Sequence, residues 1–174
     1  MILGIDPGLD GGLALLGTNP TQLHVIPTIG TSKKGQRVID ETALRTLLED
    51  IQIRSKRESS SLFAFVEKVH AMPKQGVTST FSFGCGYGLL RGILCGLCIP
   101  YRLVMPKEWQ RVVLEGLNRK QPKVAAADYV SRAWPLLDFK ATPRCTTRHS
   151  GLVDAVCIAE YGLRVMGTKP PPWE

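Results

Sequence analysis

The first thirty residues consist of short apolar runs separated by tight turns, and this pattern constrains the fold more than any other feature. Residues 1–6 form an apolar run that ends at Asp6, and a Pro-Gly turn separates it from a second run over 11–16. A third run, rich in β-branched residues, covers 22–29. Connections this short join antiparallel neighbours, so we predict that three antiparallel strands open the fold.

Strands and helices alternate after this opening. Residues 38–54 carry leucines at helical spacing, with acids early and bases late, an order that the helix dipole favours. Two more apolar strands are expected over 62–66 and 101–105. Further helices are predicted over residues 78–97, from Pro106 onward, over 122–134 and over 151–166. The pattern predicts an α/β fold in which helices flank one mixed sheet.

Length and composition limit the organisation of the chain. Its 174 residues can bury one good core, and no Pro, Ser or Gly linker divides them. We therefore expect one domain over residues 1–166 and a flexible Pro-rich tail over 167–174.

The charge of the chain favours a polyanionic partner. Lys and Arg number 22 against 15 Asp and Glu, which gives a formal net charge of +7. Charge alone does not separate a nucleic acid from a membrane surface. However, the sequence has no run of about 18 apolar residues and no basic stretch leading into an apolar segment at its start. We expect no membrane association, and a cytoplasmic (bacterial or viral) or organellar location with no secretion.

The cysteines predict no disulfide framework, because five is an odd number in a chain without a secretion signal. Cys95 and Cys98 have zinc-ligand spacing but no second pair, and burial in an apolar helix is the favoured interpretation. Glycines in that helix would let it approach the sheet closely, or would let it meet a second copy of the chain. They are Gly84, Gly86, Gly88 and Gly92.

Three acids interrupt apolar segments where acids are usually excluded. Asp6 and Glu67 end predicted strands, and Asp154 lies within the last helix. Each alone could be a helix cap, a turn former or half of an ion pair. If the strands and the helix bring all three to one point, the carboxylates need a cation, and hard oxygen ligands suit Mg²⁺ or Mn²⁺. The pattern predicts a phosphodiesterase with two ions, one activating water and the other neutralising the leaving oxygen.

Three motifs, in order, resemble the RuvC family of Holliday junction resolvases, including its phage and chloroplast relatives. They are Ile-Leu-Gly-Ile-Asp6-Pro-Gly, Phe-Val-Glu67-Lys-Val and His149-Ser-Gly-Leu-Val-Asp154-Ala-Val. Residues 83–92 and 104–109 and the helix that contains Lys123 also fit the pattern of that family. The resemblance spans most of the chain.

This resemblance implies a ribonuclease-H-like fold with a five-stranded mixed sheet, in which three antiparallel strands are followed by two parallel ones. It also implies a Mg²⁺-dependent crossover junction endonuclease that acts on branched DNA as a homodimer and uses no nucleotide cofactor. Paired symmetrical nicks in strands of like polarity would leave 5′-phosphates. Asp6, Glu67 and Asp154 match the metal-binding acids of the family.

The sequence departs from the family at its fourth ligand. An Asp or His usually stands three or four residues before the last acid, and here Gly151 and Ser150 take those places. His149, one step further back, is the candidate for that role, as a ligand or as a group that positions or deprotonates water. It is also explained as an exposed histidine at a helix start. His70 corresponds to the aromatic residue with which the family opens the junction centre.

Basic and polar residues flank the expected acidic site, as contact with a phosphate backbone requires. The candidates are Lys68, His70, Lys74, Gln75, Arg111, Arg119, Lys120 and Lys123. Any single lysine among them is equally explained as a solvated surface charge. Phe81 and Phe83 could stack on unpaired bases or pack in the core.

Three other functions stay open. A ribonuclease H or another nuclease for branched DNA or RNA/DNA hybrids would use the same acids, since fold does not determine substrate. An actin-like phosphate-binding protein would also begin with an Asp-Pro-Gly hairpin, but this chain has no room for a second lobe. A catalytically inactive junction-binding protein would keep the basic residues and lose an acid, whereas all three acids are present.

Overall fold

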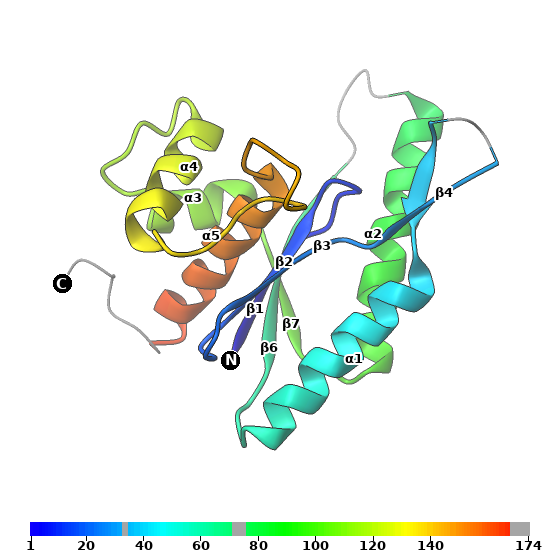
Figure 1. Cartoon of the computed structure of the whole chain (residues 1–174), viewed down its shortest axis with the longest axis horizontal. Helices are drawn as coiled ribbons and strands as arrows, with labels where there is room; N and C mark the ends of the chain where they lie inside the picture. Colours follow the sequence, from blue (N-terminus) through cyan, green and yellow to red (C-terminus); the bar gives the residue numbers. More distant parts are fainter. Residues whose placement is uncertain (33–34, 71–75, 168–174) are drawn as a thin grey trace.

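Five strands form one mixed sheet at the centre of the computed structural model, which describes residues 1–32, 35–70 and 76–167 (Figure 1). Across the sheet the order is β3-β2-β1-β6-β7, with β1 antiparallel to β2, β2 antiparallel to β3, and β6 and β7 parallel to β1. The bounds are β1 Ile2–Asp6, β2 Gly12–Leu16, β3 Gln22–Val25, β6 Phe63–Glu67 and β7 Tyr101–Val104. The predicted five-stranded mixed sheet, three antiparallel strands and then two parallel ones, is confirmed.

Helices cover both faces of this sheet (Figure 1). One face carries α1 (Glu41–Arg57) and α2 (Val77–Gly96), and the other carries α3 (Pro106–Val113), α4 (Pro122–Ala133) and α5 (Ser150–Val165). Alternate strand residues enter two separate cores. Leu3 and Ile5 pack toward α1 and α2, whereas Ile2 and Phe65 pack toward α5.

The α5 helix lies unusually close to the sheet. A Cβ added to Gly4 would collide with the backbone of Ala155 and Ala159, and one added to Gly12 would collide with the backbone of Gly151. Backbone therefore meets backbone along the first turns of α5, which only glycine permits at these positions. This contact determines how far α5 stands from the ends of β1 and β2.

Two predicted elements have different bounds from those expected. The run over 22–29 is not one strand, because β3 ends at Val25 and β4 (Thr28–Gly30) pairs with β5 (Arg37–Ile39) in a separate two-stranded sheet. The helix expected from residue 38 begins at Glu41. The carboxylate of Asp40 accepts a hydrogen bond from the Ala43 amide at 2.9 Å, and this N-cap starts the helix at Glu41.

The burial predicted for two cysteines in and after α2 is wrong. Cys95 and Cys98 were predicted to be buried, but both are exposed, and Cys98 lies beyond the helix end; all five cysteines are free. Gly84, Gly88 and Gly92 face open space, so close packing on the sheet does not explain them. The helix buries Leu90 and Leu94 and leaves much of its apolar surface outside.

Residues 168–174 of the expected tail lie outside the described residues. Among the described residues, no helix combines the length and the apolar character that crossing a membrane requires.

The close contact of α5 generates a stability prediction. Gly4→Val should lower the free energy of unfolding by about 3 kcal/mol or more, because the new side chain would push α5 off the sheet. Urea denaturation followed by circular dichroism would measure it. Gly30→Ala is the matched control, since a Cβ there meets nothing within 4 Å, and it should change the stability by less than about 1 kcal/mol. Equal effects of the two substitutions would contradict this account of α5 packing.

Candidate functional site

Two acids close adjacent parallel strands at the same edge of the sheet. Asp6 is the last residue of β1 and Glu67 the last of β6, and the register pairs Ile5 with Val66 one step before them. Both carboxylates are partly buried. The parallel pairing therefore places them side by side at the carboxyl ends of their strands.

The alternation of side chains places both acids on the α5 face. Phe65 packs in the core on that face, and Glu67 is two residues further along β6. Gly4 contacts α5, and Asp6 is two residues further along β1.

The third acid comes from α5 itself. Asp154 lies in the second turn of α5, and its side chain is 15% exposed. Gly151, one turn earlier, has its backbone against Asp10 and Gly11 in the loop between β1 and β2. The backbone contact that holds α5 on the hairpin thus also carries Asp154 to the edge where β1 and β6 end.

Electrostatics indicate that the three carboxylates are close enough to interact. Burial, reinforced by the negative charges of Glu67 and Asp154, raises the pKa of Asp6 to about 7. Burial also raises the pKa of Glu67, with the charge of Asp154 adding to it, and burial raises the pKa of Asp154. The site therefore carries more negative charge than its own surroundings stabilise.

Two neighbours offset part of this charge. The Lys123 ammonium lies 3.7 Å from Asp154 Oδ2 and lowers the pKa of all three acids. The Trp109 indole N–H donates a hydrogen bond of 2.9 Å to Glu67 Oε1. Lys123 was expected at the DNA surface, and the structure places it beside the acids. Trp109 was not predicted at the site, since a hydrophobicity pattern does not show the hydrogen bond that an indole N–H can donate.

His149 lies directly before the first residue of α5. It is the N-cap residue of α5, and its Nδ1 is buried with no hydrogen-bond partner among the described residues. Its charge acts on Asp10, which accepts a hydrogen bond of 2.7 Å from Arg37. No interaction of His149 with Asp6, Glu67 or Asp154 is found within the described residues, so its catalytic role stays a prediction.

The other predicted DNA-binding residues fall into two groups. Lys68 and His70 are exposed directly after β6, on the loop that follows Glu67, and Lys74 and Gln75 lie outside the described residues. The remaining three are exposed: Arg111 lies on α3, and Arg119 and Lys120 lie in the connection from α3 to α4.

The donor chemistry of the site fits a divalent cation. Three carboxylates whose pKa values are raised by burial, and for Asp6 and Glu67 also by neighbouring acids, offer hard oxygen ligands and need positive charge. In the described part of the chain, no three Asp, Glu, His or Cys side chains are grouped so that they could hold an ion as they stand. Asp6, Glu67 and Asp154 are the residues that would hold a divalent cation, which would replace the Lys123 ammonium as the counter-charge of Asp154.

The strand order, the parallel β1–β6 pair and the helices on both faces define a ribonuclease-H-like fold. Solved structures with this fold include RuvC of Thermus thermophilus, which is 17% identical, with 98% of each chain covered and a TM-score of 0.54. The same protein in complex with Holliday junction substrate is 16% identical, with 98% of each chain covered and a TM-score of 0.55. The yeast mitochondrial Holliday junction resolvase Ydc2 is 13% identical over 96% of this chain and 79% of that one, with a TM-score of 0.47.

No protein-family model matches the chain. No curated protein matches it either. The resemblance to RuvC predicted from the motifs is confirmed at the level of the fold.

The raised pKa of Asp6 predicts how stability depends on pH. An acid whose pKa rises on folding destabilises the fold increasingly as the pH rises from its unfolded value of 3.8 to its folded value of about 7. Without divalent cations, Asp6→Asn should raise the free energy of unfolding at pH 8 by roughly 1–3 kcal/mol, with a gain that shrinks toward pH 4. Urea titrations between pH 4 and 8 would measure the difference.

The control for this prediction is Asp50→Asn, the same chemical change at an exposed position of α1. It should leave stability unchanged at every pH. Added Mg²⁺ should stabilise the wild type more than Asp6→Asn and so reduce the gap between them. A gain that is independent of pH would contradict the electrostatic origin of the effect.

Proposed function

We propose that this chain is a Mg²⁺-dependent DNA endonuclease that resolves four-way (Holliday) junctions by paired symmetrical nicks. The observation that carries the proposal is the meeting of Asp6, Glu67 and Asp154 at one edge of a ribonuclease-H-like sheet. Three partly buried carboxylates with only one nearby ammonium group destabilise the folded protein, and a bound cation would remove this destabilisation.

Asp6, Glu67 and Asp154 would hold the metal, with two ions in the proposed site and Mn²⁺ able to replace Mg²⁺. When bound, Mg²⁺ lowers the pKa of coordinated water and neutralises developing charge on the leaving oxygen, so that hydrolysis leaves a 5′-phosphate. Two further residues of the chain orient the acids and the substrate. Trp109 fixes the orientation of Glu67 through its hydrogen bond, and Lys123, released from Asp154, can pair with a phosphate oxygen.

The proton held by Asp6 also has a role in this scheme. With a pKa of about 7, Asp6 is partly protonated at neutral pH in the absence of a cation. Cation binding favours its charged form, so binding should release protons and should tighten as the pH rises.

Branched DNA is the proposed substrate for two reasons. The net charge of +7 suits a polyanion, and the RuvC structure in complex with Holliday junction substrate shares this fold. The alternative is a nuclease of the same type that acts on other branched DNA or on RNA/DNA hybrids, because the acids alone do not select the substrate. The intact set of three acids weighs against an inactive junction-binding protein.

The outer surface of α2 is the proposed homodimer contact. Its exposed residues include small and apolar side chains that recur at helical spacing and form what we term the small-residue face. They are Phe81, Gly84, Cys85, Gly88, Gly92 and Cys95. Phe81 is 72% exposed, which is unusual for a phenylalanine unless a partner covers it.

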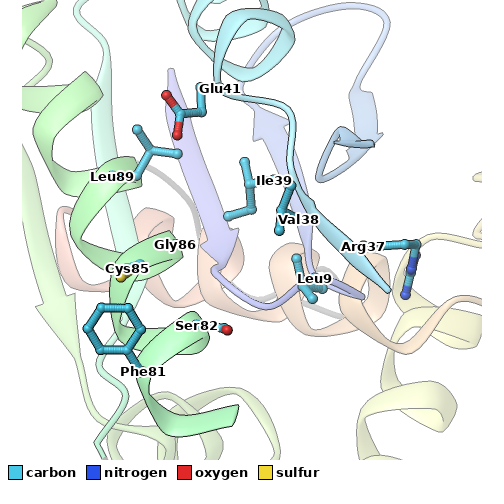
Figure 2. A pocket seen from close by; sticks show the side chains of 10 residues that line it. All are labelled: Leu9, Arg37, Val38, Ile39, Glu41, Phe81, Ser82, Cys85, Gly86 and Leu89. Carbon is cyan, nitrogen blue, oxygen red and sulfur yellow. The ribbon is translucent and has the colours of Figure 1, made fainter. Parts of the chain in front are cut away.

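A mostly apolar groove opens beside this face. Figure 2 shows Phe81 and Cys85 of α2 on one side, and Leu9, Val38 and Ile39 from the β1–β2 loop and β5 on the other. The groove would receive side chains of the second copy, whose own glycines let the two helices approach closely.

The dimer proposal predicts that a charged side chain on the outer surface of α2 disrupts the dimer, whereas one on the surface of α1 does not. Gly88→Arg should convert a dimer to a monomer in analytical ultracentrifugation and should uncouple the two nicks of a junction. The helix itself should tolerate the change, since Arg favours helix more than Gly and the site is open. Ile53→Arg on the exposed surface of α1 is the control and should stay dimeric. A monomeric wild type would refute the proposal.

The catalytic proposal is tested on a synthetic mobile four-way junction. The wild type should make paired nicks with Mg²⁺ or Mn²⁺ and none with chelator, and Asp6→Asn should lower the rate by about two orders of magnitude or more. Asp50→Asn should cut normally. Linear duplex, flap and RNA/DNA hybrid substrates run in parallel. Preferential cutting of the hybrid would favour the ribonuclease H alternative, and junction binding without cleavage by any metal would refute the enzyme.

A further inference from the structure

Two thiols are exposed at the C-terminal end of α2 and take no part in the proposed chemistry. Cys95 lies in the last turn of the helix, and Cys98 directly follows the C-cap residue Leu97. Pairs of cysteines at this spacing chelate one metal ion, and four thiolates form a tetrahedral ligand set for Zn²⁺. One copy of the chain supplies half of such a set, because no further Asp, Glu, His or Cys is grouped with this pair in the described part of the chain.

The turn that carries Cys98 is one in which glycine is the usual residue. The Ile99 amide donates a hydrogen bond to the Leu94 carbonyl at 2.9 Å, and the Cys98 amide donates one to the Cys95 carbonyl at 3.0 Å. These are the two bonds of a Schellman motif, whose residue after the C-cap adopts a left-handed backbone. Cys98 has a φ of +54°, where a side chain costs stability and glycine does not. The chain therefore has a thiol at a position that backbone stability alone does not favour.

This turn is anchored to the protein on its inner side and open on its outer side. Ile99 is buried, and the side-chain amide of Gln52 in α1 donates a hydrogen bond to the Leu97 carbonyl. Next to the thiols, a Cβ added to Gly92 or Gly96 would meet nothing within 4 Å. The two thiols therefore lie on an ordered turn, which lowers the entropic cost of binding, with room for a second chain beside them.

Cys95 belongs to the small-residue face, the proposed contact between two copies. Along this face, Cys85, Gly88, Gly92 and Cys95 follow one another at steps of three, four and three residues. This is the heptad spacing of helices that pack side by side, and in a parallel pair each position meets the same position of the other helix. A parallel pair of α2 helices would thus place Cys95 next to Cys95 of the second copy.

The direction of α2 favours the parallel arrangement. β6 ends at Glu67 and β7 runs parallel to β6, so α2 between them runs back from the acid edge of the sheet to the opposite edge (Figure 1). Two active sites that cut one junction have to face the same DNA, so both α2 helices start toward the substrate and run parallel. By two-fold symmetry, Cys95 and Cys98 of both copies then meet at the end of the dimer away from the acids.

The charge next to the thiols suits a zinc centre with four thiolates, which is doubly negative. Arg91 lies one helical turn before Cys95 and is exposed. No ion pair among the described residues involves Arg91. One such guanidinium from each copy would offset the charge of the centre.

We propose that two copies of the chain bind one Zn²⁺ ion between them through Cys95 and Cys98 of each copy, and that this ion joins the ends of the paired α2 helices. The inference rests on the proposed function, from which it takes the homodimer, and adds to it a structural metal site separate from the carboxylates. A disulfide across the dimer would need only one thiol from each copy. Chelation uses both, and so accounts for their spacing and for a thiol at the left-handed position.

The test identifies the metal ligands by absorption spectroscopy, without cleavage. The full chain, reduced and freed of metal, is titrated with Co²⁺, which gives a thiolate charge-transfer absorption when sulfur binds it but not when only carboxylates do. The absorption should saturate at one ion for each two chains, and Zn²⁺ should displace the Co²⁺. Cys95→Ser and Cys98→Ser should each lose most of it. Cys85→Ser, which removes an exposed thiol from the same helix, and Asp6→Asn should keep it.

The variant Cys98→Gly separates loss of the ligand from loss of the fold. Because glycine suits the left-handed backbone, this substitution should not lower the urea midpoint of the metal-free protein, yet it should lose most of the thiolate absorption. In sedimentation, the wild type should dimerise at least about 10-fold more tightly with Zn²⁺ than with EDTA. Cys98→Gly should dimerise equally in both. A wild-type dimer that EDTA leaves intact and a reducing agent dissociates would be held by a disulfide, which would refute the zinc site.

Cleavage of a four-way junction by the wild type in Mg²⁺ separates failure of this inference from failure of the proposed function. If the wild type makes paired nicks but gives no thiolate absorption, or gives one that saturates at one ion for each chain, the zinc site is refuted and the nuclease stands. If the wild type never cuts, and the absorption forms at one ion for each two chains and depends on both cysteines, the zinc site stands and the nuclease fails. A wild type that stays monomeric with Zn²⁺ would refute both the zinc site and the dimer contact.

Discussion

The arrangement of this molecule depends on the close approach of α5 to the β1–β2 hairpin. Gly4, Gly12 and Gly151 let backbone lie on backbone, and a single Cβ at any of them would need the helix to move outward. Because Asp154 stands one turn beyond Gly151, the distance between α5 and the sheet also determines how near Asp154 comes to Asp6. The glycines lose more conformational entropy on folding than other residues would. This entropic cost falls at the contact between α5 and the β1–β2 hairpin, next to the three acids.

The acids themselves reduce the stability of the fold. Partial burial raises the pKa values of all three, repulsion from neighbouring acids adds to this for Asp6 and Glu67, and Lys123 and Trp109 offset only part of the rise. Removal of one charge should therefore stabilise the protein while abolishing the proposed activity. Such opposition between stability and function is common where a site is built to receive a ligand that supplies the missing charge.

The short helix α3 supports the carboxylate site on one side and faces solvent on the other. Its inner side donates a hydrogen bond to Glu67 through Trp109 and anchors Glu108 to the Tyr161 hydroxyl at 3.0 Å. Its outer side presents Lys107 and Arg111 to solvent. The orientation of Glu67 therefore depends on how α3 packs against the sheet.

The sequence by itself indicated the five strands of the main sheet and most of the helices, because alternation of apolar residues and short connections are local properties, whereas the arrangement of those strands was implied by the family resemblance. It also indicated that Asp6 and Glu67 share an edge, since parallel strands of one sheet end together. Only the tertiary structure decided which surfaces are covered. The sequence left open whether the glycines of α2 pack on the sheet or meet a second copy of the chain; Gly84, Gly88 and Gly92 face open space, because burial depends on what lies against a helix and not on its composition. Likewise, Lys123 pairs with Asp154 and Trp109 donates a hydrogen bond to Glu67, although these residues are far apart in the chain. A local sequence pattern cannot show such contacts.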